Sequence, residues 1–346
     1  MKYAICFLGL LLWLSSCGTA TQEPAPTEFR IAFGSCAHED EPQPMLDIAV
    51  EQSPDVFIYL GDNIYGDSYE MDTLRAKYAR LAAKPEFQRL SAAMPILAVW
   101  DDHDYGWNDS GRHYPFKEPS KEIFMDFWGV PADNDRRKHP GIYGVEWLEK
   151  DDYRIQLILL DTRTFRDDLH FRDTTDQRWK NDYMPNEYAD STFLGEVQWA
   201  WLERQLQQSA DARIIASSNQ FSHEYNGWES WTNVPRERER MIELIARTRA
   251  NGVIFISGDV HWGEISRLET ERCYPLYDVT SSGITSTWDS VEPNANRVGP
   301  VIRQNNIGLI RLLLNEDEAT AELGLIDSSG LRVAETEFGL EALRVP

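Results

Sequence analysis

The segment VIFISGDVH, residues 253–261, shows the pattern that organises this chain, a short apolar run that stops abruptly at glycine and ionisable residues. Such a run, bounded by a turn signal, is typical of a buried strand. The pattern recurs in FRIAFGSC (29–36), DVFIYLGD (55–62), PILAVWDDHD (95–104) and YRIQLILLDTR (153–163). In α/β sheets the loops beyond the carboxyl ends of the strands meet at one edge, so we expect these polar clusters to lie close together.

Helical patterns alternate with these strands. Apolar spacing predicts helices over residues 45–52, 72–83 and 195–208, and Pro235 is suited to open another. From Ile265 onward the sequence is mostly β in character. Because the 346 residues contain neither an internal repeat nor a second domain boundary, we predict one α/β domain.

The net charge of the chain restricts the classes of molecule that the protein is expected to bind. The formal net charge is −23 at pH 7, while 42% of the residues are hydrophobic, enough for a sizeable core. A strongly acidic surface repels nucleic acid and attracts divalent cations. We therefore expect no nucleic-acid binding, and we expect an anionic substrate to be captured locally by metal.

The N-terminus has the features of an export signal. Residues 1–16 combine Lys2 with an apolar run too short to span a membrane permanently, which predicts a signal peptide. The following LSSC resembles a bacterial lipobox, so lipidation at Cys17 is expected, the alternative being an incidental thiol beside an ordinary cleavage site. Residues 17–28 then form a tether, 29–346 form the domain, and the protein is placed on the periplasmic or outer-membrane side of a bacterial cell envelope.

The strand ends supply a mixed set of metal-binding groups. Oxygen ligands alone would suit calcium or magnesium, whereas a thiolate and a phenolate indicate a stronger Lewis acid such as ferric iron. An alternative for the thiol of Cys36 is a disulfide with Cys273. The candidate ligands at the strand ends are Cys36, Asp62, Tyr65, Asp102, Asp259 and His261.

In their order and spacing these blocks resemble the calcineurin-like metallophosphoesterase superfamily, specifically its PhoD-like (alkaline phosphatase D) branch. The resemblance extends over roughly residues 29–282, with Cys36 in place of the superfamily's first histidine. It implies a four-layer αββα sandwich, in which two mixed sheets pack face to face with helices outside. Further PhoD-like segments are WDDHD (100–104), ND (108–109), GIY (141–143), DTR (161–163) and RD (166–167).

The resemblance also implies at least two metal ions, Fe³⁺ and Ca²⁺. Asp62 would bridge them, since one carboxylate can share its oxygens between two cations. The iron side would be completed by Cys36, Tyr65 and Asp259. The calcium side would be held by Asp102, Asn108 and His261.

The implied activity is hydrolysis of phosphate monoesters and diesters at neutral to alkaline pH by a monomeric enzyme, using a metal-bound hydroxide. His103 would protonate the leaving alkoxide, and Arg163 would grip a phosphoryl oxygen through its guanidinium. The alternatives are a phospholipase C-like phosphodiesterase acting on lipid headgroups and a lipoprotein that binds metal or carbohydrate without catalysis.

Some assignments stay open at this level. Asp101 and Asp104 flank Asp102 in the same turn and compete with it as the ligand. His38 fits a ligand or a neighbour of one, and the role of His223 is undetermined. Three aromatic residues could line a substrate pocket or cap the fold, with the latter favoured: Tyr225, Trp228 and Trp231.

Overall fold

The structure is a computed structural model that describes residues 25–346. The predicted signal peptide, Cys17 and most of the tether lie outside the described residues. The first strand, β1, spans Thr27–Gly34. The tether predicted over 17–28 therefore overlaps the strand, and the folded domain begins two residues earlier than expected.

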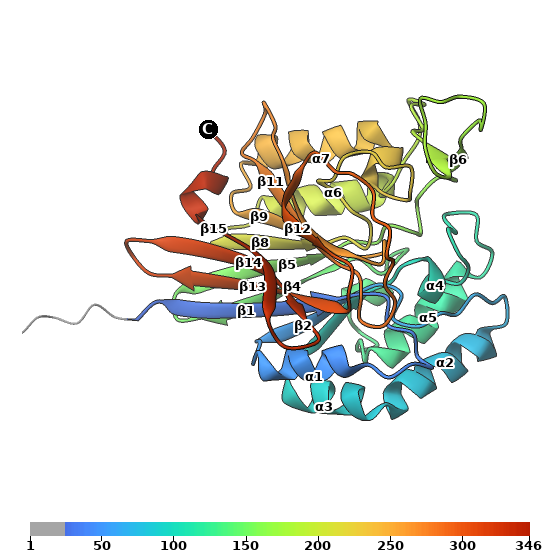
Figure 1. The fold of residues 1–346 in the computed structure, drawn as a ribbon, viewed down its shortest axis with the longest axis horizontal. Helices are drawn as coiled ribbons and strands as arrows, with labels where there is room; N and C mark the ends of the chain where they lie inside the picture. The colour runs from blue at the N-terminus through green and yellow to red at the C-terminus, as the bar shows by residue number, and fades with distance from the viewer. Residues whose placement is uncertain (1–24) are drawn as a thin grey trace, which may run out of the picture.

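The first sheet has the order β15-β14-β13-β1-β2-β3 (Figure 1). Strands β1, β2 and β3 are mutually parallel, and β13 runs antiparallel to β1. The added strands are β2 (Val56–Leu60), β3 (Ile96–Val99), β13 (Asn306–Leu314), β14 (Ala319–Asp327) and β15 (Arg332–Gly339).

The second sheet has the order β12-β10-β11-β9-β8-β5-β4. Its central strands β5, β8, β9 and β11 are parallel, and its outer strands are antiparallel to their neighbours. The bounds are β4 (Gly144–Lys150), β5 (Tyr153–Leu159), β8 (Ala212–Ala216), β9 (Val253–Ser257), β10 (Gly263–Leu268), β11 (Leu276–Ser281) and β12 (Arg297–Ile302).

Helices cover the outer face of each sheet, which completes the predicted four layers (Figure 1). One amphipathic example is α7, which buries Met241, Ile242, Leu244 and Ile245 and exposes most of its Arg and Glu residues. Each buried side chain of this kind contributes about 1.5–3 kcal/mol. One side carries α1 (Pro44–Glu51), α2 (Met71–Ala83), α3 (Pro85–Ala93) and α5 (Lys117–Phe127), and the other carries α6 (Gly195–Leu206) and α7 (Pro235–Thr248).

The two sheets are joined where their parallel strands end. A bridge pairs Ser35 with Ser282, just beyond β1 and β11. The Ser35 amide donates to the carbonyl of Ser281 at 3.0 Å, and the Ile284 amide donates to the carbonyl of Ser35 at 3.1 Å. This bridge holds the polar segments that follow the two sheets against each other, as the sequence pattern predicts.

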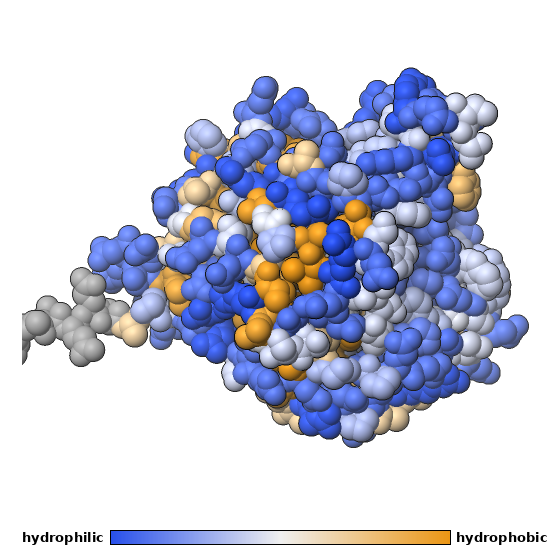
Figure 2. Space-filling view, in the orientation of Figure 1, coloured by the Kyte–Doolittle hydropathy of each residue, from blue (hydrophilic) through white to orange (hydrophobic). Residues whose placement is uncertain are grey.

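The surface agrees with the acidic composition. The face in Figure 2 is largely hydrophilic, with an apolar strip over β12 and β15, the edge strands of the two sheets. Within residues 25–346 we find no helix whose length and apolar character would suit it to crossing a membrane.

Candidate active site

A cavity of about 230 Å³ opens at the joined strand ends. Most of its lining is acidic or aromatic, and much of it comes from the loops that follow β2, β3 and β9. The lining residues are Asp62, Asp102, His103, Asn108, Asp109, Asp182, Tyr183, Trp228, Glu229, Asp259, Val260, His261 and Trp288.

The backbone at these strand ends adopts a conformation that L-residues rarely take. The φ angles are +59° at Cys36, +51° at Asp62, +73° at Asp259 and +61° at His261. Each such residue costs on the order of 1–3 kcal/mol and persists only where its surroundings fix it. The Ala37 amide, for example, donates to the Asp62 carbonyl at 2.9 Å. Strain gathered at four candidate ligands is typical of a functional site.

Four carboxylates meet at the base of the cavity. Asp62, Asp101, Asp102 and Asp259 each offer an oxygen within 4.8 Å of the others. Burial and mutual repulsion raise the pKa of Asp62 and Asp259 well above the ordinary value. Among the described residues, Oδ1 of Asp62 and Oδ1 of Asp102 have no hydrogen-bond partner. Buried carboxylates without partners are costly unless cations compensate them, so this donor set fits metal ions.

Cys36 lies beside this group as a free thiol. Its Sγ is 3.4 Å from Oδ2 of Asp62 and 3.0 Å from Oγ of Ser282. Burial and the charge of Asp62 raise the pKa of the Cys36 thiol, so cation binding would be needed to favour the thiolate. Cys273 is also free, so the alternative disulfide is not formed.

Tyr65 presents a buried phenol whose oxygen has no hydrogen-bond partner among residues 25–346. Its ring lies between two imidazoles, 4.9 Å from the centroid of His38 and 4.3 Å from that of His103. The Tyr65 amide donates to the buried carboxylate of Glu39 at 2.9 Å, and Lys77 pairs with that carboxylate at 2.8 Å. His38 therefore packs on a candidate ligand.

His103 is oriented by a carboxylate. Its Nδ1 is 2.8 Å from both oxygens of Asp67. Burial alone lowers the pKa of His103, but the charges of Asp102, Asp62 and Asp67 outweigh it and raise the pKa to about 11. Bound cations would offset part of this negative field. The imidazole is nevertheless placed at the cavity wall with a carboxylate holding it in its protonated form.

The structure separates the three acids of the 101–104 turn. Asp104 accepts from the amide of Asp101 at 3.0 Å and from the side chain of Asn63 at 3.2 Å, so it shapes the turn. Asp101 accepts from Arg163 and from Ser218. Asp102, the first residue of the short helix α4 (Asp102–Tyr105), reaches the cavity. This placement favours Asp102 over its neighbours as the ligand.

Arg163 is placed differently from our expectation of a phosphoryl grip. Its side chain is 0% exposed and does not line the cavity. Nε donates to Asp101 at 2.5 Å, and Nη1 donates to both oxygens of Glu229 at 2.7 and 2.8 Å. Because the guanidinium is buried and paired with these two acids, Arg163 holds Asp101 and Glu229 in place and presents no surface to the cavity.

Sequence reasoning selected one residue of a candidate ligand loop and missed two others nearby. Asn108, expected to bind metal, is exposed at the cavity rim, where its backbone N–H donates to Oδ1 of Asp67 at 3.1 Å. Its neighbour Asp109, which also lines the cavity, forms a group with Asp102 and Glu229, with oxygens within 4.8 Å of one another. Neither Asp109 nor Glu229 follows a strand, so the strand-end pattern did not select them. The one available signal was the ND dipeptide at 108–109.

The remaining histidine and tryptophan candidates differ in whether they line the cavity. His223 is fully buried and absent from the cavity lining, and burial lowers its pKa to about 4. Trp231 is a core residue that packs on Phe193 at 4.6 Å. Trp228 lines the cavity, so the expected capping role fits only part of this aromatic group.

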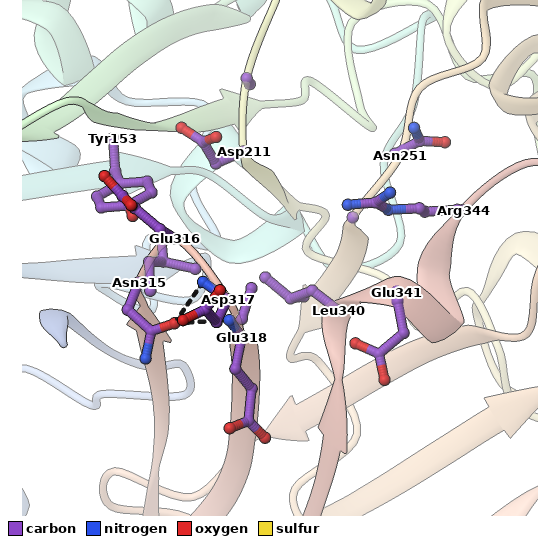
Figure 3. Close-up of a pocket in the computed structure, with 14 residues that line it drawn as sticks. Tyr153, Asp211, Asn251, Asn315, Glu316, Asp317, Glu318, Leu340, Glu341 and Arg344 are labelled. Carbon is purple, nitrogen blue, oxygen red and sulfur yellow. Dashed lines mark hydrogen bonds between the residues drawn. The ribbon is translucent and has the colours of Figure 1, made fainter. Parts of the chain in front are cut away.

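A larger cavity of about 480 Å³ lies elsewhere, where the β13–β14 turn meets the C-terminal residues (Figure 3). Its lining includes Glu316, Asp317, Glu318 and Glu341. Part of this turn is ordered by its own hydrogen bonds, since Oδ1 of Asn315 accepts from the amides of Asp317 and Glu318. This cavity contains none of the strand-end residues, so size does not identify the active site here.

Comparisons with known proteins give a consistent result. A family model described as PhoD-like phosphatase matches residues 153–309. Alkaline phosphatase D of Bacillus subtilis (strain 168) is 25% identical over 314 residues, which covers 78% of this chain and 52% of that protein. The chain thus spans about half the length of the curated relative it matches. The resemblance to PhoD-like phosphatases predicted from the sequence is confirmed.

Solved structures show the same fold. A structure of PhoD superposes with a TM-score of 0.69 at 18% identity and covers 93% of this chain and 72% of that one. GAP50, described as the anchor in the inner membrane complex of Plasmodium, superposes with a TM-score of 0.55 at 12% identity, covering 90% and 89%. One fold therefore occurs in a protein described as an anchor as well as in PhoD, so function has to be argued from the site.

Proposed function

We propose that this PhoD-like chain hydrolyses phosphate monoesters and diesters in the strand-end cavity with at least two bound metal ions. The observation that supports this most is the buried group of Asp62, Asp102 and Asp259, next to the Arg163-paired Asp101 and a histidine held by Asp67, because carboxylates gathered in this way need cations when they are ionised. A site that only stored metal would not need an oriented proton donor.

The side chains present suggest how two ions would be held. On one side, Sγ of Cys36 lies 3.4 Å from Oδ2 of Asp62, and Asp259 has an oxygen within 4.8 Å of Asp62. Tyr65 adds a buried phenol, and Cys36 and Tyr65 would favour Fe³⁺ once deprotonated. Asp102 and His261, with Asp109 or Asn108, offer oxygen and nitrogen ligands on the other side, suited to Ca²⁺ or a similar ion. When bound, such ions supply Lewis acidity and a nucleophile derived from water at neutral pH.

The protein's own groups would perform the remaining steps. His103 would donate a proton to the leaving alkoxide from Nε2, because Asp67 holds Nδ1. Asp102 is fixed by the amide of Asp109, which donates to its Oδ2 at 2.6 Å. Arg163 is buried together with its two partners. Its positive charge would keep Asp101 and Glu229 ionised and thereby hold both carboxylates in place beside the cavity.

A substrate panel tests the function. We expect the metal-loaded protein to hydrolyse nitrophenyl phosphate and bis(nitrophenyl) phosphate, and to lose both activities on exhaustive chelation and regain them with added Fe³⁺ and Ca²⁺. His103→Ala should lower kcat by about 10²–10⁴-fold, the usual contribution of a general acid. An inert monoester with an active diester would narrow the activity to a phosphodiesterase. No turnover of either ester, with no effect of His103→Ala, would contradict the proposal.

The metal assignment has an independent test. We expect elemental analysis of natively expressed protein to find iron and calcium, and visible spectroscopy to show a ligand-to-metal absorption band. Tyr65→Phe and Cys36→Ser should each weaken or shift that band because each removes a candidate iron ligand. The variant His113→Gln, at an exposed histidine that does not line the cavity, is the control. An unchanged band in both ligand variants would exclude this iron site.

Two further features remain proposals. A lipid anchor at Cys17 would hold a monomeric domain at the bacterial envelope, and the support for it is the LSSC sequence.

A phospholipase C-like activity on lipid headgroups is the nearest alternative to the proposed phosphatase activity. Phosphatidylcholine in the same substrate panel distinguishes the two activities. Turnover of that lipid above both nitrophenyl esters would replace the phosphatase assignment.

A further inference from the structure

Trp288 stands at the mouth of the strand-end cavity with 42% of its surface exposed. Its amide donates to the carbonyl of His261 at 3.0 Å, and its ring stacks on the His261 imidazole at 5.2 Å with an interplanar angle of 24°. A large apolar side chain that is fixed in place yet left open to solvent is a feature of binding surfaces.

A second tryptophan completes an aromatic wall. Trp228 also lines the cavity, and its ring meets that of Trp288 at 5.5 Å in an edge-to-face arrangement of 63°. Because the two rings contact each other, they leave no gap between facing planes of the kind that encloses a quaternary ammonium group. The exposed surface of Trp288 instead suits one flat ring laid against it.

The size of the cavity places such a ring outside the catalytic cluster. About 230 Å³ is below the usual range of roughly 300–1,000 Å³ for small-molecule sites. The phosphoryl group and adjoining atoms would fill it, and the rest of the ester would extend over the rim. The rim also carries the exposed Asp182, and the chain has a net charge of −23, which disfavours a long polyanion there.

We propose that Trp288, backed by Trp228, forms a subsite for a planar aromatic leaving group, so that the preferred substrates are small phosphate esters of nucleosides or similar ring compounds. The inference rests on the proposed function and specifies its substrate class. Trp288 would act on binding of the leaving group and therefore on KM more than on the chemical step.

The sharpest test compares two esters with the same leaving oxygen. Adenosine 5′-monophosphate and ribose 5-phosphate both release phosphate from a primary 5′ alkoxide, and they differ in the base. We expect kcat/KM of the metal-loaded protein to be about tenfold higher for the nucleotide, through KM, as one stacked base would provide. Trp288→Leu, which keeps apolar cover on His261, should bring the ratio close to one, and Trp288→Phe should retain part of it.

The ratio of kcat/KM between the two esters does not change when a substitution lowers the activity on both esters equally. Tyr188→Ala removes an exposed aromatic residue outside the cavity and should leave the ratio unchanged. Equal values for both esters in the wild-type protein, or a ratio unaffected by Trp288→Leu, would overturn the subsite while phosphatase activity on nitrophenyl phosphate stands. A preference for phosphocholine over its uncharged analogue 3,3-dimethylbutyl phosphate, lost in Trp288→Leu, would overturn it in favour of a cation site.

Binding can be measured without turnover. Titration of adenosine into the wild-type protein and into Trp288→Leu, followed by NMR so that millimolar binding is detected, should show binding that the variant weakens, even if no ester is hydrolysed. Adenosine that binds both proteins equally, or neither, would exclude the subsite. This measurement therefore separates failure of the subsite from failure of the proposed hydrolysis.

Discussion

Asp62→Asn is expected to lower phosphoester hydrolysis by about three orders of magnitude and to reduce the metal content of the purified protein. Asp62 lies within reach of Cys36 on one side and Asp102 on the other, and its Oδ1 has no protein partner among the described residues. The amide keeps the shape but loses the charge that two cations would share. Loss of about 4 kcal/mol of transition-state stabilisation would lower kcat/KM by roughly 10³-fold.

The same substitution should not weaken the metal-free fold. Burial, with repulsion from Asp102, Asp101 and Asp104, raises the pKa of Asp62, so removal of its charge relieves an unfavourable interaction. We expect the chelated variant to unfold at a temperature no lower than the chelated wild type. Asp152→Asn, at an exposed carboxylate remote from the cavity, is the matched control. Full activity and unchanged metal content in Asp62→Asn would exclude the proposed centre.

Arg163→Met is expected to cause the largest loss of stability among the site variants. The guanidinium is fully buried between Asp101 and Glu229, and Glu229 also pairs with Arg166 at 3.0 Å. Removal of one member of a buried ion cluster leaves uncompensated charge, which costs about 3–5 kcal/mol. Denaturant unfolding followed by tryptophan fluorescence would show this loss of stability as a large fall in the denaturant concentration at the midpoint of unfolding.

Two comparisons separate charge from geometry in this cluster. Arg163→Lys keeps the charge but cannot reach both acids with a planar fork, so an intermediate loss is expected. Arg89→Met breaks an exposed pair with Asp47 and should change the midpoint little. If Arg163→Met folded with wild-type stability and only raised KM, the direct phosphoryl contact first expected for Arg163 would be restored.

The fold was largely predictable because its strands are locally encoded. The apolar run that opens the segment 253–261 forms β9 (Val253–Ser257), and the helix predicted over 72–83 corresponds to α2 (Met71–Ala83). Prediction failed at α3 and α5, for which no helix was expected. The α3 sequence PEFQRLSAA buries Leu90 alone, so its apolar pattern is weak. Its position depends on packing against α1 and α2, which the local sequence does not report.

The strand-end sequences by themselves determined where the reactive groups gather. The sequence GDVH after β9 and the DDHD turn after β3 are fixed by a few neighbouring residues, and parallel strands bring their carboxyl ends to one edge. Tertiary structure alone decided what each group does there. Arg163 meets Asp101 across 62 residues of sequence and Glu229 across 66, and Trp288 reaches His261 from a separate loop. Such pairings depend on how two sheets dock, which no short pattern encodes.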